Sequence, residues 1–488
     1  MRHWNTLQRV RWLRSVVVIL AVYSVIGASG AMALGPDSAE GHYSTLTRIN
    51  VSNVNSLGYA WSYDLNTAQG LEATPVVVDS VMYASAPWGF VHAIDARTGK
   101  GLWSFDPHVD GRIMSKVCCG VANRGLAFSR GRVFVASIDG RLFALEARDG
   151  TVIWQTDTIV DHNRGYTVTG AVYVADDIAV VGNSGAELDA RGYISAYDVN
   201  TGKLRWRFFT VPASPKGPFE NPELKAAART WDPHSLWQVG LGGTVWGGMA
   251  YDPDLHLLYF GTGNGVVYGR EQRSPRGGDN LFLASVLAIN TVTGRLAWYY
   301  QEVPGDQWDY DASANIVLTD LQIRGRRRKV LLHAPKNGFF YVFDRRDGQL
   351  LSAEPYASVT WASRVDPKSG RPIETAQGHY SKEPRLVFPS LVGAHNWQPM
   401  AFNPATGLAY IPAVEASAVF WMPQRAFVYK KGALNIETLY VWPTFNAGES
   451  GLDAQIAKGL PPLDELARGQ PDPTLRSYLR AWDPWLVR

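Results

Sequence analysis

The stretch HAIDARTGKGLW, residues 92–103, decides the fold. Its alternating apolar residues predict a short strand, its Asp-x-x-Thr-Gly run predicts a tight turn in which glycine takes a positive φ, and its tryptophan closes the next strand. The early copies of this unit lie about 50 residues apart, a period typical of propeller blades. The other copies are FALEARDGTVIW at 143–154, SAYDVNTGKLRW at 195–206, LAINTVTGRLAW at 287–298 and the shorter YVFDRRDG at 341–348.

A further hairpin precedes each copy, as in the run 131–140. Four short strands per repeat predict an all-β chain that forms a radial β-propeller, in which the tryptophan packs between neighbouring blades. A pair of packed sheets is the alternative, but it does not explain the period. The runs 211–240 and 352–390 interrupt the rhythm and are rich in proline and polar residues. We expect them to be long loops on one face.

The first 33 residues predict an export signal. Four arginines between residues 2 and 14 precede an apolar run at 16–26, and Ala31-Met32-Ala33 forms an A-x-A cleavage pattern. The apolar run is short for a transmembrane helix, which favours a cleaved signal peptide over the alternative of an uncleaved anchor. We therefore expect a signal peptide at 1–33, a propeller domain at 42–488 and a periplasmic location.

Cys118 and Cys119 are the only two cysteines of the chain, and they are adjacent. Two buried free thiols are one interpretation. The other is a disulfide between neighbours, which closes a strained ring and adds little loop-closure entropy. Such a ring suits a flat, rigid surface on which something rests. Export to an oxidising compartment favours the disulfide.

The composition fits a large all-β protein with many turns. The chain has 488 residues, 47 glycines, 18 tryptophans and a formal net charge of +3. Its one basic run, residues 324–329, lies between apolar stretches and predicts a solvated hairpin tip. This pattern argues against a nucleic-acid partner.

Eight short motifs in a fixed order resemble those of the quinoprotein alcohol dehydrogenases, periplasmic propellers that bind pyrroloquinoline quinone (PQQ). The resemblance begins at about Leu46 and implies an eight-bladed type of propeller, here incomplete with about five to six blades. The motifs are EATP at 72–75, CCGVANRG at 118–125, GAE at 185–187, GTVW at 243–246, GTGN at 261–264, PGDQWDY at 304–310, APKNGFF at 334–340 and GAHNW at 393–397.

The resemblance implies a cofactor held between two flat surfaces, the Cys118–Cys119 disulfide and the Trp246 indole. Arg124 and Lys336 would give charge-assisted hydrogen bonds to the carboxylates and quinone oxygens of PQQ. Taken singly, Trp246 could equally be an inter-blade core residue and Arg124 a solvated loop residue. The remaining residues that the resemblance places around the cofactor are Glu72, Thr169, Gly185, Ala186, Thr244, Asn396 and Trp397.

The resemblance also implies a metal ion. Glu187, Asn264 and Asp309 offer only oxygen ligands, which suit a hard cation such as calcium. Asp309 would also be the general base that takes the substrate hydroxyl proton, while the metal polarises the quinone carbonyl. The alternative for Asp309 is an ordinary turn aspartate.

Asp311 bears on which metal is bound. Family members that use lanthanides resemble this chain in having an aspartate two residues after the catalytic one. If Asp309 and Asp311 lie on a strand, they share a face, so that both carboxylates reach one ion. The extra negative charge favours a trivalent cation, and we expect a lanthanide in preference to calcium. An exposed turn carboxylate is the alternative.

The resemblance stops at the end of the chain. Residues 481–484, Ala-Trp-Asp-Pro, open a blade near the sixth in the family, where later strands pair with the segment corresponding to 54–63. No Cys-x-x-Cys-His motif is present, so we expect no cytochrome c domain and a separate cytochrome c as electron acceptor. Three explanations stay open for the missing blades: a fragment or early-terminated product, a second polypeptide that supplies them, or a non-catalytic propeller.

We therefore predict a periplasmic oxidoreductase that oxidises an alcohol to an aldehyde or ketone by hydride transfer to PQQ. A PQQ sugar or aldehyde dehydrogenase is a second enzyme hypothesis, although the sugar branch generally lacks the Cys118–Cys119 pair. An envelope binding or assembly propeller is the alternative from another class. Such a scaffold would have no need of Glu187, Asn264, Asp309 and Lys336 together.

Overall fold

The computed structural model describes residues 39–441 and residue 473, all within the compact unit that begins at Ala33. The predicted signal peptide at 1–33 and the run 481–484 lie outside the described residues. Within the described part of the chain, no helix is both long and apolar enough to cross a bilayer. Between residues 39 and 441 the α-helices are α1 (Glu223–Ala227) and α2 (Arg270–Arg273), and the 3-10 turns are η1 (Val54–Ser56), η2 (Pro87–Gly89), η3 (Gly111–Lys116), η4 (Ala186–Leu188), η5 (Ala228–Thr230), η6 (Trp237–Val239) and η7 (Ala376–Gly378).

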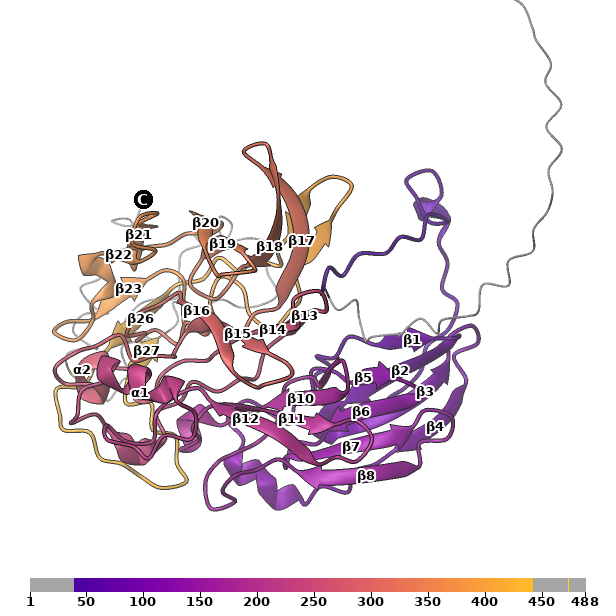
Figure 1. The fold of residues 1–488 in the computed structure, drawn as a ribbon, viewed down its shortest axis with the longest axis horizontal. Coiled ribbons are helices and arrows are strands. Elements are labelled where there is room, and N and C mark those ends of the chain that lie inside the picture. Colours follow the sequence, from indigo (N-terminus) through magenta and orange to yellow (C-terminus); the bar gives the residue numbers. More distant parts are fainter. Residues whose placement is uncertain (1–38, 442–472, 474–488) are drawn as a thin grey trace, which may run out of the picture. The chain divides into compact units, whose positions relative to one another are not determined.

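Five antiparallel four-stranded sheets follow one another along the chain (Figure 1). Each is a simple meander whose neighbours in sequence are neighbours in space. The strands are β1 (Val76–Val78), β2 (Val81–Ala86), β3 (Phe90–Asp95) and β4 (Gly101–Phe105); β5 (Ala127–Ser129), β6 (Arg132–Ala136), β7 (Arg141–Glu146) and β8 (Val152–Asp157); β9 (Tyr173–Ala175), β10 (Ile178–Gly182), β11 (Tyr193–Asp198) and β12 (Leu204–Phe209); β13 (Met249–Asp252), β14 (Leu257–Gly261), β15 (Ser285–Asn290) and β16 (Leu296–Gln301); and β17 (Ile316–Ile323), β18 (Arg326–His333), β19 (Phe339–Asp344) and β20 (Leu350–Pro355).

The described residues after β20 form smaller sheets. The pairs are β21 (Ala362–Val365) with β22 (Pro372–Glu374), and β24 (Ala401–Asn403) with β25 (Leu408–Tyr410). A three-stranded sheet joins β23 (Arg385–Val387), β26 (Ala418–Trp421) and β27 (Leu439–Val441). The prediction of an all-β propeller with five nearly complete blades and part of a sixth is confirmed over the described residues.

Consecutive sheets share their apolar cores. Side chains from one sheet and the next belong to the same buried cluster, so each sheet covers a face of its neighbour. This is the packing expected of successive blades. Examples of buried pairs that share a cluster are Val91 with Val133, Phe134 with Val181, Ile194 with Leu258, and Tyr259 with Leu331.

Trp61 and the four tryptophans of the repeat each pack on the turn glycine of the next copy, and for those four this is the predicted packing between neighbouring blades. The indole Nε1 donates a hydrogen bond to a carbonyl of that turn at 2.8–3.2 Å. A Cβ on the glycine would lie only 2.5–2.6 Å from the indole, so the close contact, as well as the positive φ, requires glycine there. The pairs are Trp61 with Gly99, Trp103 with Gly150, Trp154 with Gly202, Trp206 with Gly294, and Trp298 with Gly348.

The two expected loops differ from one another. The run 211–240 contains only α1, η5 and η6, as a long connection would. The expectation for 352–390 is wrong, because this run contains the end of β20, the β21–β22 hairpin and β23. These strands are too short to show alternation, and Pro372 stands at the first position of β22, where a strand tolerates proline.

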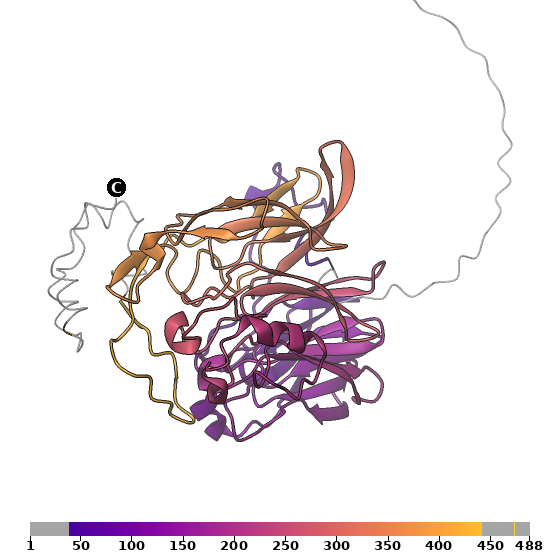
Figure 2. The ribbon, with the colours of Figure 1, turned by 60° about the vertical axis from the view of Figure 1, so that its left-hand side comes forward.

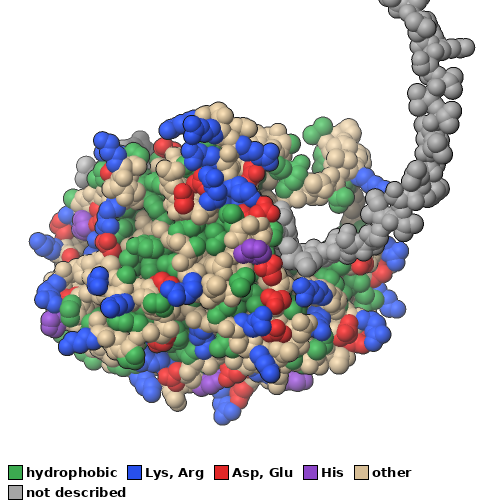
Figure 3. Space-filling model, viewed as in Figure 1, with side chains coloured by type: hydrophobic (Ala, Val, Ile, Leu, Met, Phe, Trp, Pro, Cys, Tyr) green, Lys and Arg blue, Asp and Glu red, His purple; other side chains and the backbone are tan. Residues whose placement is uncertain are grey.

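The basic run 324–329 forms a hairpin tip as predicted. Arg324 and Gly325 make the turn between β17 and β18, both with positive φ. Figure 3 shows Lys and Arg side chains gathered over this hairpin, while elsewhere on that face both charge signs are interspersed.

Asp344→Asn is expected to lower the free energy of unfolding by roughly 1–2 kcal/mol at neutral pH. Asp344 is buried at the end of β19 and pairs with Arg346 at 2.7 Å and Arg328 at 3.2 Å. The hydrogen bond from Arg346 lowers the pKa of this carboxyl to about 2. The stabilisation is therefore full above the ordinary pKa of 3.8 and is lost as the pH falls towards 2.

Urea unfolding of the wild type and the variant at several pH values checks this. The difference between them should shrink as the pH falls from 4 towards 2. Glu354→Gln, which changes an exposed carboxylate on β20, is the control and should leave unfolding unchanged. A difference that stays constant over this pH range would contradict the ion-pair explanation.

Candidate active site

The loop between β16 and β17 wraps around one buried carboxylate. Asp306 Oδ1 accepts hydrogen bonds from the backbone N–H groups of Trp308 and Tyr310, both at 3.1 Å. This turn places Asp309 at φ 67, in the left-handed region. The expectation that Asp309 and Asp311 lie on a strand is wrong, because the Asp306 side chain competes for the backbone donors that a strand would use.

Lys336 joins Asp309 and Asp311. Its Nζ lies 3.1 Å from Asp309 Oδ2 and 2.6 Å from Asp311 Oδ2, and the ammonium also donates to the Asp309 carbonyl at 3.0 Å. Burial raises the pKa of Asp309 well above its usual range, and the Lys336 charge only partly opposes this. Burial by itself would lower the pKa of Lys336, but the charges of Asp309 and Asp311 outweigh it and raise that pKa.

Asn264 connects this group to Glu187. The Asn264 backbone N–H donates to Asp311 Oδ1 at 2.6 Å, and its side-chain Nδ2 donates to Glu187 Oε1 at 3.1 Å. Burial raises the pKa of Glu187, and the Asp311 charge adds to the effect, while the Asn264 hydrogen bond and the Lys336 charge oppose it. The structure thus brings all four predicted metal residues into one connected group with Lys336.

The donor set fits a hard cation in kind and in charge. It contains three carboxylates and the Asn264 amide, and the single Lys336 ammonium leaves excess negative charge when all three carboxylates are ionised. Among residues 39–441 and 473, no group of three or more His, Cys, Asp and Glu side chains is already arranged to hold a metal ion. Asn264 turns its amide nitrogen towards Glu187, so coordination requires that amide to rotate and present its oxygen.

A second group surrounds Arg124. The guanidinium pairs with Glu72, at 2.8 Å between Nη2 and Oε2, and lies over the Trp246 ring, with its Cζ 4.7 Å from the ring centre. Its backbone N–H donates to the Thr169 carbonyl at 3.1 Å. Arg124 Nε is buried and has no hydrogen-bond partner among the described residues. A free N–H on a cation beside an indole face suits an aromatic ligand that carries carboxylates.

The two groups are neighbours. Burial lowers the pKa of Arg124, and the nearby Glu72 and Asp311 charges oppose that shift. Asp311 therefore lies within electrostatic reach of Arg124 as well as in contact with Lys336. The group around Arg124 and the group around Lys336 are therefore close enough for their charges to interact.

Backbone geometry explains several of the other predicted residues. Gly185 has φ 99, and a Cβ there would lie 1.9 Å from the Gly165 carbonyl oxygen. It leads into η4, which begins at Ala186 and carries Glu187. The buried Thr244 accepts a hydrogen bond from Gly263 N–H at 2.8 Å through its carbonyl, which sets the Trp246 segment beside the Asn264 loop.

Cys118 and Cys119 form a disulfide with each other directly after η3, and both are exposed. The oxidised alternative is the one that the structure contains. The cofactor-facing role of this pair stays a prediction.

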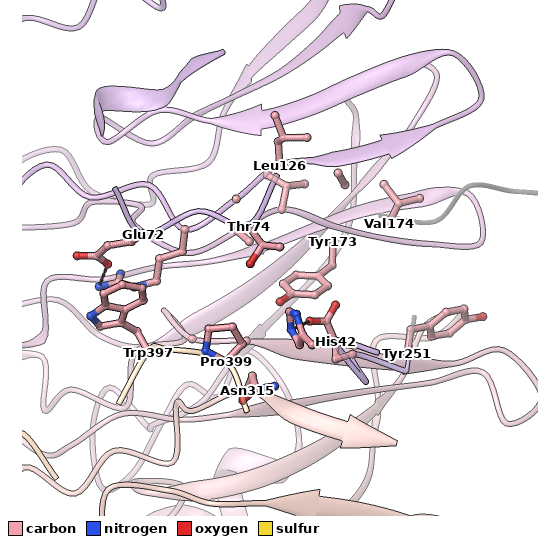
Figure 4. Close-up of a pocket in the computed structure, with 18 residues that line it drawn as sticks. His42, Glu72, Thr74, Leu126, Tyr173, Val174, Tyr251, Asn315, Trp397 and Pro399 are labelled. Atoms are coloured by element: carbon pink, nitrogen blue, oxygen red, sulfur yellow. Dashed lines mark ion pairs between the residues drawn. The ribbon is translucent and has the colours of Figure 1, made fainter. Parts of the chain in front are cut away.

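Asn396 and Trp397 follow from the last motif. Asn396 Nδ2 donates to the Val392 carbonyl at 2.8 Å, and its Oδ1 accepts from Trp397 N–H at 2.9 Å. Trp397 lines a pocket together with Glu72 and Arg124. Figure 4 shows Glu72 and Trp397 at one end of this pocket and His42, Tyr173 and Tyr251 towards the other.

Sequence reasoning missed several residues that shape the site. Arg273 is fully buried and donates to the carbonyls of Val267, Tyr268 and Asp306 at 2.5–3.1 Å, which ties the Asn264 loop to the Asp309 loop. Burial lowers its pKa to about 10. The aspartate two residues before Trp308 was a usable signal for a side-chain turn. Arg273, in the polar run Arg-Glu-Gln-Arg, gave none.

Comparison with known proteins shows the same architecture. Residues 32–359 match the family described as "PQQ: Glucose/ethanol/alcohol dehydrogenase, beta-propeller domain". The quinohemoprotein alcohol dehydrogenase ADH IIB of Pseudomonas putida is 51% identical over 397 residues, which are 81% of this chain and 57% of that protein. A 1-butanol dehydrogenase (cytochrome c) of Thauera butanivorans is 44% identical over 387 residues, 78% of this chain and 55% of that protein.

A solved structure is also similar. A europium-containing methanol dehydrogenase superposes with a TM-score of 0.78 at 33% identity, and the match covers 85% of this chain and 73% of that chain. The chain spans little more than half the length of the curated relatives that it matches.

Proposed function

Because this chain belongs to the family of PQQ-dependent alcohol dehydrogenase β-propellers, we propose that it oxidises an alcohol to an aldehyde or ketone. The observation that supports this most directly is the contact of Lys336 with both Asp309 and Asp311, beside the Asn264–Glu187 pair. A non-catalytic envelope scaffold would gain nothing from two buried acids that share one ammonium, because burying charge is costly.

Each residue of the proposed active site has its own role in the reaction. PQQ, when bound, accepts the hydride, and a hard cation polarises its carbonyl. Arg124 would hold carboxylate groups of the cofactor through its free Nε, and Trp246 and the Cys118–Cys119 pair would contact its ring. Asp309 Oδ2 takes the hydroxyl proton of the alcohol, while Lys336, 3.1 Å away, fixes the orientation of that carboxylate.

The proposed metal ligands are Glu187, Asn264, Asp309 and Asp311. Three of these side chains are carboxylates, and the ion is a lanthanide in preference to calcium, since a third negative charge gains more from a trivalent ion. The structural similarity to a europium-containing methanol dehydrogenase supports this choice.

The proposed partners follow from the same reasoning. A separate cytochrome c accepts the electrons, which agrees with a relative described as cytochrome c-dependent. Residues 1–33 act as a signal peptide that directs the propeller domain, 42–488, to the periplasm.

Titration of the purified chain with PQQ and metal tests the proposal. We expect the quinone absorbance to change at micromolar PQQ in the presence of La³⁺, with weaker binding in Ca²⁺, and ethanol to reduce an electron-accepting dye. Ca²⁺ that supports activity where La³⁺ does not would contradict the lanthanide preference. A chain that binds no PQQ with either metal would favour the scaffold alternative.

A further inference from the structure

Between β26 and β27 the chain leaves its sheet at Met422 and returns at Thr438. We call residues 422–438 the strap. Figures 1 and 2 both show this yellow segment running away from β26 and β27 towards the magenta part of the chain. A hairpin connection is usually much shorter, so such an excursion calls for an explanation.

The strap bonds to two loops that carry proposed metal ligands. Its Asn435 N–H donates to the Glu187 carbonyl at 3.0 Å. Its Ile436 carbonyl accepts from Tyr268 N–H at 3.1 Å, in the loop that follows Asn264. The strap therefore joins the Glu187 loop to the Asn264 loop by main-chain hydrogen bonds.

One buried carboxylate fixes the strap in place. Asp189, which is 0% exposed and has φ 76, accepts three hydrogen bonds from the strap. Tyr429 Oη and Gly432 N donate to its Oδ2 at 2.8 and 3.3 Å, and Asn435 Nδ2 donates to its Oδ1 at 3.1 Å. A buried carboxylate is stable only when such donors satisfy it, so Asp189 and the strap depend on each other.

Apolar packing also holds the strap in place. Phe427 and Tyr429 pack against the buried cluster that includes Ala186 and Val266, which flank Glu187 and the Asn264 loop. The strap then leads into Tyr440 on β27. Burial raises the pKa of that phenol, and the charges of Asp309 and Glu187 add to the effect. The strap thus returns to its sheet past the Glu187 loop and ends within electrostatic reach of Asp309 and Glu187.

We propose that Asp189 is a positioning residue that locks the strap and thereby sets the distance between the Glu187 and Asn264 loops. This rests on the proposed function in one respect, since the metal is what those loops would hold. Asp189 touches neither Asp309 nor Lys336 in the hydrogen bonds above, so it acts through the strap. Outer groups that orient metal ligands typically change metal affinity 10–100-fold when they are removed.

Asp189→Asn tests this with little change in size. The amide replaces one acceptor oxygen with a donor group that faces other donors, so at least one of the three bonds is lost. Trypsin reports on the strap directly, because Lys430 and Lys431 are exposed within it. We expect cleavage at these lysines to become about tenfold faster, and the La³⁺ affinity of the PQQ-loaded chain, measured by calorimetry, to fall about tenfold or more.

Two further variants make the result specific. Tyr429→Phe removes one of the three bonds and should shift both readouts in the same direction by a smaller factor. Glu437→Gln removes the 2.9 Å ion pair with the exposed Arg425 inside the strap and should change neither.

The outcomes separate the possible explanations. Faster cleavage with unchanged La³⁺ affinity would overturn the positioning role and leave Asp189 a stabilising residue only. Unchanged cleavage would show that Asp189 does not lock the strap. A wild-type chain that binds neither La³⁺ nor Ca²⁺ would refute the metal part together with the proposed function, while the cleavage ratio would still decide whether Asp189 locks the strap.

Discussion

Asp309→Asn is expected to lower alcohol turnover by on the order of a thousandfold while leaving the chain folded. The amide cannot take the hydroxyl proton, and it is a poorer ligand for a hard cation. Because burial destabilises the Asp309 charge, a neutral side chain of the same shape should cost little folding free energy. Dye-coupled oxidation of ethanol with PQQ and La³⁺ measures the first effect, and thermal unfolding measures the second.

Asp311→Asn is the matched control for this result. Asp311 shares Lys336 with Asp309 but also accepts the Asn264 N–H, so it holds the metal loop in addition to any ion. We expect Asp311→Asn to weaken La³⁺ binding. Its turnover should therefore be low at limiting La³⁺ and recover in part when the La³⁺ concentration is high. Turnover of Asp309→Asn above a tenth of the wild type at saturating metal would show that another group is the base.

The blades could be predicted because their signal is local and repeated. An Asp-x-x-Thr-Gly turn and a tryptophan four residues after its glycine specify a hairpin without reference to distant residues. The copies then differ little in what they pack against, so Trp103 and Trp206 dock on Gly150 and Gly294 in the same way. The β21–β22 hairpin has a related turn at 366–370, but no tryptophan follows its glycine and its strands are short, so the sequence pattern favours a loop there.

The site was predictable in its composition but less so in its geometry. The motifs correctly indicated that Asp309, Lys336, Asn264 and Glu187 come together, although they lie far apart in sequence. The strand expected at Asp309 failed because one side chain, Asp306, reorganises the local backbone. Such a contact depends on which donor is nearest after folding, and a strand pattern cannot reveal it.

Asp189 and Arg273 show a different limit. Asp189 is bonded to Tyr429 and Asn435, 240 and 246 residues later in the chain, and Arg273 bonds to carbonyls, which every residue possesses. Neither contact leaves a trace in local periodicity. Both residues are charged and would be expected on the surface, yet both are fully buried.

Gly202→Ala is expected to lower the free energy of unfolding by more than about 3 kcal/mol. Gly202 has φ 67, where an L-residue is strained by about 1 kcal/mol. The new Cβ would also lie 2.6 Å from Trp154 Cε3. The indole must then move. This breaks its 3.0 Å hydrogen bond to the Val199 carbonyl and loosens the packing between the second and third sheets.

Gly131→Ala separates these two causes. Gly131 has φ 74 but no atom within 4 Å of its would-be Cβ, so only the backbone strain of about 1 kcal/mol should appear. Urea unfolding followed by tryptophan fluorescence and circular dichroism gives both values under one condition. If Gly202→Ala lowers the free energy of unfolding by no more than Gly131→Ala does, the Trp154 indole moves aside at no cost. In that case the tryptophan–glycine contacts would mark the spacing of the blades without stabilising it, and the shared apolar clusters alone would hold neighbouring blades together.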